Sequence, residues 1–349
     1  MTTSAVSNRW QAGILVLLAA IFLTIVNSAA HALECGPGFG PGRHKVTIQS
    51  DGVDRSAVFF VPSSYSGTRK LPLVFDFHGS NSNPVAQLSR SHWDQVAERE
   101  GFLVMALQGS LKGSIQGGHA WNVPGVVPVA GVSADNGLDE SAFILDAIRY
   151  AEDNACVDQK RIYATGYSGG GRMLSQFICN GNDAFAAAGF MMGLRAGYPE
   201  QEEGGGWRPR PDTCNPAKPV SIIAFSGLKD NVNPFAGGGK PYWQYGGEVA
   251  VGRWAALNGC DMKPMNHEGE KASVSMYGGC RDGATVMSFV IPDAGHAWLK
   301  KRVPFQLASS ADDRLEEVDA TAGIWEFFKN SGGGLLAGEP NKSGAPSRQ

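Results

Sequence analysis

The 349-residue sequence lacks several features that would point to a particular class of protein. It has no Cys-x-x-Cys pair, which argues against a zinc site and against thiol redox chemistry. Its 30 basic and 33 acidic residues give a net charge of −3, so nothing in the charge favours nucleic acid as a partner. No internal repeat is found. What remains is a globular chain long enough for one large domain or two.

Long apolar runs are also scarce, since only residues 12–26, AGILVLLAAIFLTIV, form one. Arg9 precedes this run, and Ala30-His31-Ala32 resembles a signal-peptidase site. We therefore expect a signal peptide over residues 1–32, cleaved after Ala32, and an extracellular or periplasmic protein with no stable membrane anchor. The alternative is an uncleaved anchor, but the run is short for a span of about 20 residues.

Six cysteines follow the expected cleavage point: Cys35, Cys156, Cys179, Cys214, Cys260 and Cys280. An even number in an exported protein predicts three disulfides. Spacing alone leaves many connectivities open.

Apolar runs that alternate with amphipathic stretches predict an α/β fold with a mainly parallel sheet and helices on both faces. Residues 44–48 and 56–61 are typical of antiparallel strands, and the apolar run 71–77 of a strand buried on both faces. Further strands are expected at 101–106, 161–165, 184–192, 220–225 and 286–291. Helices are expected at 91–100, 139–154, 171–179, 249–258 and 320–328.

The folded domain is expected to occupy residues 33–330. The glycine-rich segment 109–137 predicts a long loop. The irregular insertion 198–215 could cover a site as a lid, or could be a plain exposed loop. The glycine-, proline- and serine-rich segment 331–349 is typical of a disordered tail.

Gly166-Tyr167-Ser168-Gly169-Gly170 lies between a predicted strand and a predicted helix. A Gly-x-Ser-x-Gly stretch is weak evidence alone, because glycine-rich turns are common. In this setting it predicts a nucleophile elbow, with Ser168 on a sharp turn at a helix N-terminus. Ser168 is therefore the candidate nucleophile.

A serine nucleophile needs a general base and an acid that orients it. In hydrolases of this architecture the chain order is serine, acid, histidine. His296 follows the last predicted strand and is preferred to His267, which lies in a polar stretch. Asp230 follows the preceding strand and is preferred to Asp293, which lies only three residues before His296 and more simply shapes the turn.

An oxyanion hole needs two fixed backbone N–H groups. One is expected from Gly169, the residue after the nucleophile. The other is expected from the loop that follows residues 71–77, where Ser80 is the candidate. His78 precedes the nucleophile in the chain and is expected to brace this loop.

Together these residues resemble the secreted α/β-hydrolase esterases that include feruloyl esterases of carbohydrate esterase family 1 and polyhydroxybutyrate depolymerases. The resemblance covers roughly residues 35–330 and rests on the order of these stretches: "PLVFDFHG", "WN", "LDESAFI", "CVDQKRIYATGYSGGGRM", "FSGLKDNVNPFAGG", "WAALNGC" and "GHAW". It implies an α/β-hydrolase fold, a Ser168–Asp230–His296 triad and ester hydrolysis without a metal or cofactor. It also suggests the disulfides Cys156–Cys179 and Cys260–Cys280, leaving Cys35 with Cys214.

The sequence departs from this family in three places. Many relatives read "HTWPG" at the histidine, where this chain reads His296-Ala297-Trp298-Leu299-Lys300. Many carry Asn or Asp after the serine, where Gly169 stands here. Many polyester depolymerases carry a separate substrate-binding domain, which is not expected in this tail. The last departure favours a soluble ester or oligomer.

The leading expected substrate is therefore a feruloyl or other acyl ester on plant cell-wall polysaccharide. A hydroxyalkanoate polyester or its oligomers is the alternative, and a non-catalytic carbohydrate-binding protein is the alternative from another class. Trp121 and Trp298 are the preferred substrate-binding aromatics, because aromatic faces stack on phenolic and sugar rings. The other candidates are Trp207, Tyr242, Trp243 and Tyr245.

Overall fold

The computed structural model describes residue 35 and residues 38–129, 131–132, 138–238, 240–299, 303–305 and 316–331. The predicted signal peptide and all but the first residue of the predicted tail lie outside the described residues. Within the described part, no helix combines the length and the apolar character needed to cross a membrane.

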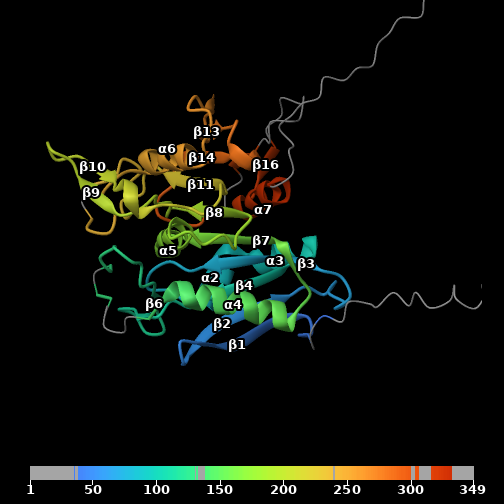
Figure 1. The fold of residues 1–349 in the computed structure, drawn as a ribbon. Helices are drawn as coiled ribbons and strands as arrows, with labels where there is room; N and C mark the ends of the chain where they lie inside the picture. The colour runs from blue at the N-terminus through green and yellow to red at the C-terminus, as the bar shows by residue number, and fades with distance from the viewer. Residues whose placement is uncertain are drawn as a thin grey trace, which may run out of the picture.

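The centre of the molecule is a ten-stranded sheet (Figure 1). Its strands, in order across the sheet, are β1 (Gly42–Ser50), β2 (Val53–Val61), β4 (Leu103–Leu107), β3 (Leu71–Phe77), β7 (Val157–Tyr167), β8 (Ala187–Met191), β11 (Ser221–Gly227), β14 (Val286–Ile291), β13 (Ser273–Tyr277) and β12 (Met265–Glu268). The six strands from β4 to β14 are parallel, and antiparallel pairs close both edges. The predicted α/β class with a mainly parallel sheet is confirmed.

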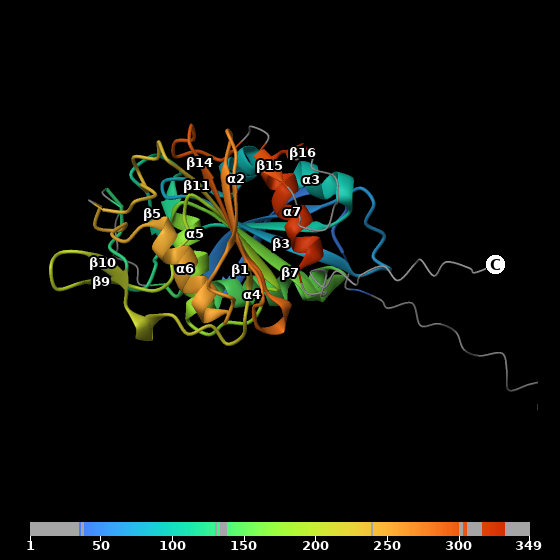
Figure 2. The same cartoon turned by 90° about the horizontal axis from the view of Figure 1, so that it is seen from above.

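Helices cover both faces of this sheet, as the view from above shows (Figure 2). One face carries α4 (Glu140–Asn154), α5 (Gly169–Cys179) and α6 (Gly247–Leu257). The other carries α2 (Pro84–Ser91), α3 (Trp93–Glu100) and α7 (Ala320–Asn330). Each layer buries its own apolar cluster, represented by Phe143 and Leu174 on the first face and by Trp93 and Ile324 on the second. Strands such as β3 are buried on both faces, which explains their uninterrupted apolar sequence.

The sequence missed the edge strands β12 and β13 because β12 is fully exposed and has no apolar alternation. The predicted helix at 91–100 is α3, which α2 precedes across a left-handed His92. The predicted loop 109–137 contains the short pair β5 (Leu111–Lys112) and β6 (His119–Ala120). The insertion 198–215 contains a hairpin of β9 (Pro199–Gln201) and β10 (Trp207–Pro209), and its role as a lid stays a prediction. Outside the large sheet, β15 (Val303–Phe305) pairs with β16 (Glu316–Val318).

The disulfides are Cys35–Cys156, Cys179–Cys214 and Cys260–Cys280, so two of the three predicted pairings are wrong. Cys156 and Cys179 flank a strand and a helix of 11 residues each. Such a strand spans roughly 36 Å and such a helix only about 16 Å, so the helix ends well short of the start of the strand. Cys179 instead meets the end of the 198–215 insertion, where the Asn215 N–H donates to the Cys179 carbonyl at 2.8 Å.

Candidate active site

Ser168 occupies the turn between β7 and α5, at the carboxyl edge of the parallel sheet. Its backbone has φ 50° and ψ −113°, a strained conformation for a residue with a side chain. The Ser168 N–H donates to the Met191 carbonyl at 2.9 Å, and its carbonyl accepts from the Arg172 N–H at 3.1 Å. A Cβ at Gly170 would lie 2.3 Å from the Phe77 carbonyl oxygen, so glycine is what lets α5 approach β3 this closely.

His296 follows β14 and reaches back to the serine. Its Nε2 lies 2.8 Å from Ser168 Oγ, and its Nδ1 lies 2.7 Å from Asp230 Oδ2. Asp230 follows β11, so the carboxyl ends of β7, β11 and β14 bring the three side chains together across 128 residues of sequence. The hydroxyl of Tyr167 donates to the His296 carbonyl at 3.0 Å and fixes the histidine loop.

The carboxyl of Asp230 is held in its charged form. Its Oδ1 accepts from the N–H groups of Val232 and Asn233, each at 2.8 Å. Burial opposes ionisation, but the hydrogen bond from His296 and these two N–H groups outweigh it and lower the pKa of Asp230. An ionised carboxylate at this place fixes the imidazole so that Nε2 can accept a proton from Ser168.

The residues weighed against these lie elsewhere. Asp293 is exposed and forms an ion pair with Lys229 at 2.6 Å. His267 lies in the exposed strand β12.

Ser80 and Gly169, the predicted oxyanion donors, lie against each other. A Cβ at Gly169 would lie 3.0 Å from the Ser80 nitrogen and 2.4 Å from its Oγ. His78 braces the same loop: its Nδ1 lies 2.8 Å from the Gly79 carbonyl, and its Nε2 accepts from the Gly109 N–H at 3.0 Å. Burial lowers the pKa of His78 to about 4, so the ring is neutral and its two hydrogen bonds define one tautomer.

The two preferred tryptophans occupy different surroundings. The Trp121 indole donates to the His78 carbonyl at 2.7 Å, and the residue lines a small cavity next to Ser80 and Gly169. The Trp298 indole is buried and donates to Thr321 Oγ1 on α7 at 2.9 Å. This placement favours a packing role for Trp298 over the predicted contact with substrate.

Sequence reasoning missed Glu140, which anchors the loop that carries Trp121. Its Oε1 accepts from the N–H groups of Ser110 and Asn122, and its Oε2 pairs with Arg55 at 2.6 Å. The whole group is buried beneath the loop. The stretch "LDESAFI" is one of those that carry the family resemblance, but only the fold shows that its glutamate holds the segment beside the oxyanion donors.

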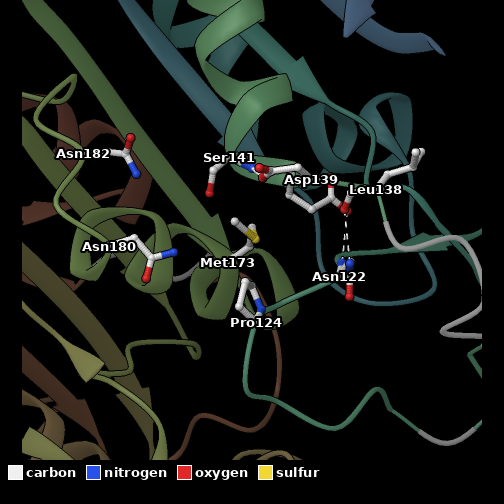
Figure 3. Close-up of a pocket in the computed structure, with 9 residues that line it drawn as sticks. Asn122, Pro124, Leu138, Asp139, Ser141, Met173, Asn180 and Asn182 are labelled. Carbon is white, nitrogen blue, oxygen red and sulfur yellow. Dashed lines mark hydrogen bonds between the residues drawn. The ribbon is translucent and has the colours of Figure 1, made fainter. Parts of the chain in front are cut away.

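Two cavities adjoin this loop. Consecutive residues of the segment 121–124 alternate between them. The first cavity, about 10 Å³, is lined by Trp121 and Val123. The second, about 300 Å³, is polar and is lined by Asn122 and Pro124, with Asn180 and Asn182 from the segment that follows α5 (Figure 3). In the part of the chain that is described, no three His, Cys, Asp or Glu side chains are grouped to hold a metal ion.

No family model matches the chain. It is 32% identical over 250 residues to feruloyl esterase B of Piromyces equi, which covers 70% of this chain and 42% of that protein. It is 26% identical over 321 residues to a protein named "Probable feruloyl esterase C" of Aspergillus flavus, covering 90% of this chain and 97% of the relative. The chain thus spans less than half of the first relative and nearly all of the second.

A solved acetyl xylan esterase from Aspergillus awamori superposes with a TM-score of 0.49 at 15% identity, over 73% of this chain and 94% of that one. The sequence similarity to feruloyl esterases does not depend on this structural comparison. It agrees with the family resemblance of the stretches quoted in the sequence analysis. These sequence similarities are consistent with the feruloyl esterase family.

Proposed function

We propose that this protein is an exported serine esterase that hydrolyses feruloyl or related acyl esters of plant cell-wall polysaccharides. The observation that carries the mechanism is the continuous chain of contacts from Ser168 Oγ through His296 to Asp230. The names of the two relatives support the acyl group. The apolar run at 12–26 and three disulfides support export, because disulfides persist in oxidising compartments.

The reaction proceeds in two halves. Ser168 Oγ attacks the ester carbonyl while His296 Nε2 takes its proton, and the N–H groups of Gly169 and Ser80 stabilise the oxyanion. Collapse breaks the ester bond, and the alcohol leaves with the proton from His296. Water then attacks the acyl-enzyme, giving its proton to His296, and the acid is released as Ser168 recovers its hydrogen. Activity falls on acidification, because a protonated imidazole cannot accept the serine proton.

Purified protein on methyl ferulate, a soluble 3-hydroxybutyrate oligomer and p-nitrophenyl acetate tests this proposal, with released acid or nitrophenol as the readout. Ser168→Ala should lose at least about 10⁴-fold in kcat. Ser89→Ala is the matched control, because Ser89 is an exposed serine of α2 whose hydroxyl bonds only a backbone carbonyl one turn away.

The pattern over the three substrates decides the acyl group. Release of ferulate without oligomer cleavage supports the proposal, and the reverse places the protein in polyester turnover. Activity on the acetyl ester alone would keep the triad and discard both substrates. Activity that Ser168→Ala retains in full would refute the nucleophile.

A further inference from the structure

Arg172 is a buried cation in the first turn of α5, four residues after Ser168. Its exposed fraction is 4%. Its Nη2 donates to Ser80 Oγ at 3.3 Å, and its guanidinium stacks over the Tyr242 ring at 4.8 Å. Its Nε and Nη1 are buried without any hydrogen-bond partner, and among the described residues no carboxylate pairs with it. The fold therefore leaves two charged donors unused.

A second guanidinium, that of Arg195, adds to the positive charge at this place. Arg195 is 5% exposed, and its positive charge adds to the effect of burial in lowering the pKa of Arg172. Its Nη1 donates to the Tyr245 carbonyl at 2.6 Å, and its group stacks on the rings of Trp243 and Tyr245, while Nη2 has no partner. Neither arginine has a counter-ion among the described residues.

A buried charge without a counter-ion is costly, typically several kcal/mol. Burial lowers the pKa of Arg172 to about 10, so the group still carries its charge near neutral pH. A hydrophobic side chain would fill the same space without this cost. A cation kept here is therefore better explained by a ligand than by packing.

The Arg172 side chain adjoins the candidate oxyanion site, since its Nη2 would lie 3.3 Å from a Cβ at Gly169. Arg172 lines the small cavity together with Ser80, Gly169 and Trp121. The cavity holds about 10 Å³, which is close to the space of one water-sized oxygen. Only the end of a substituent can enter it. Most of the other lining residues are apolar, namely Ala120, Val123, Val126, Val127, Pro128 and Val129, so Arg172 is the one charged group among the described residues that line this cavity, and a negatively charged end can pair with it.

We propose that Arg172 is a specificity residue that binds a carboxylate of the substrate, so that the enzyme prefers acidic esters over neutral ones. This inference rests on the proposed function, because it names a substrate class for the same site. The carboxylate has two chemical sources. It belongs either to the acid part of the ester or to a uronic acid in the alcohol part.

Two substrate pairs separate these sources. Ethyl hydrogen succinate and ethyl succinamate differ only in a carboxylate or an amide on the acid part. Acetylated glucuronic acid and acetylated glucuronamide differ in the same way on the alcohol part. The wild type should prefer the charged member of one pair by about ten- to a hundredfold in kcat/KM, the range expected for a charge-assisted hydrogen bond.

Arg172→Gln should abolish that preference, and Arg172→Lys should keep part of it. Arg149→Gln is the control, since Arg149 is an exposed arginine of α4 paired with Asp146. The readout is the ratio of kcat/KM for the charged substrate to kcat/KM for the neutral one, because loss of the hydrogen bond from Arg172 to Ser80 can lower the turnover of both substrates. Equal kcat/KM in both wild-type pairs would overturn the proposal, as would a preference that survives Arg172→Gln.

A ligand-binding measurement that needs no turnover tests the carboxylate site separately from the proposed esterase activity. It also gives a result if Arg172→Gln does not fold, because it uses the wild type and Ser168→Ala. Succinate should raise the Tm of the wild type and of Ser168→Ala, and neutral succinamide should not, because only the anion pairs with the buried cation. Equal effects of the two compounds would refute the carboxylate site. If the wild type had no esterase activity but succinate still raised its Tm, only the proposed function would be refuted.

Discussion

The most direct test of the proposed oxyanion site is the substitution Gly169→Ala. Gly169 is the first residue of α5, and its φ is not positive, so alanine fits the backbone and favours the helix. The added Cβ would lie 2.4 Å from Ser80 Oγ, 3.0 Å from the Ser80 nitrogen and 3.3 Å from Arg172 Nη2. The substitution therefore acts on the gap between the two proposed donors and hardly on the helix itself.

The size of the loss in kcat depends on how far the Ser80 hydroxyl and backbone nitrogen can move away from the added Cβ. The Ser80 hydroxyl can rotate away, at the cost of its hydrogen bond to Arg172. The Ser80 nitrogen is backbone and must shift by a few tenths of an ångström to relieve a contact of 3.0 Å. Oxyanion donors work over about 2.7–3.1 Å, so such a shift weakens the donor without removing it. We expect kcat on p-nitrophenyl acetate to fall about 10- to 100-fold, less than the 10²–10³ of a lost donor.

The control is Gly252→Ala in α6, a helical glycine with open space around its Cβ position. It should keep wild-type kcat and gain about 0.5–1 kcal/mol of stability, because alanine is the better helix former. Steady-state kinetics and thermal unfolding of both variants make the comparison. If Gly169→Ala kept the wild-type kcat with an unchanged Tm, the Gly169 and Ser80 amides would not form the oxyanion site.

Two further predictions concern stability. Asp76 is fully buried, and burial raises its pKa from 3.8 to about 6, so the folded state favours the protonated form and this stabilisation is lost as the pH rises through 6. Relative to Asp76→Asn, the wild type should lose about 2 kcal/mol between pH 4 and pH 7 in urea unfolding, and a difference independent of pH would contradict this. Replacing Cys35 and Cys156 with serine should cost more stability than replacing Cys260 and Cys280, about 5 against about 3 kcal/mol, because the first bond closes a loop with a sequence separation of 121 and the second of 20. An equal loss in the two variants would show that loop entropy does not set these stabilities.

The central sheet and the three clustered side chains could be predicted because each has a local signal. Buried parallel strands are short apolar runs, and the elbow is a glycine-flanked serine between a strand and a helix. Ser168, Asp230 and His296 each follow a strand, and parallel strands end at one edge of a sheet. The chain order then left few choices.

The disulfides and the arginine had no such signal. Pairing depends on how far α5 returns along β7, which follows from a strand rising about 3.3 Å per residue and a helix only 1.5 Å. In the sequence, Arg172 cannot be told from a solvent-exposed arginine in the first turn of a helix. Only the fold brings Tyr242 and Ser80 into contact with it. The edge strand β12 is exposed throughout, so no burial pattern exists in its sequence.

The glycine after the nucleophile, where many relatives carry a larger residue, can be explained by its neighbour. Ser80 Oγ occupies the space that a side chain at 169 would take, and Arg172 holds it there. Ser80→Ala removes this oxygen, and among the three nearest atoms to a Cβ at 169 only the Ser80 nitrogen and Arg172 Nη2 would remain. If the oxygen is the main obstacle, kcat/KM of Ser80→Ala/Gly169→Ala should return to within about tenfold of Ser80→Ala alone, so that the two changes are strongly coupled. If instead the fold-losses in kcat/KM of the two single variants multiply in the double variant, the Ser80 backbone nitrogen is the main obstacle to a side chain at position 169. The backbone of the oxyanion loop, and not the Ser80 hydroxyl, would then require glycine at this position.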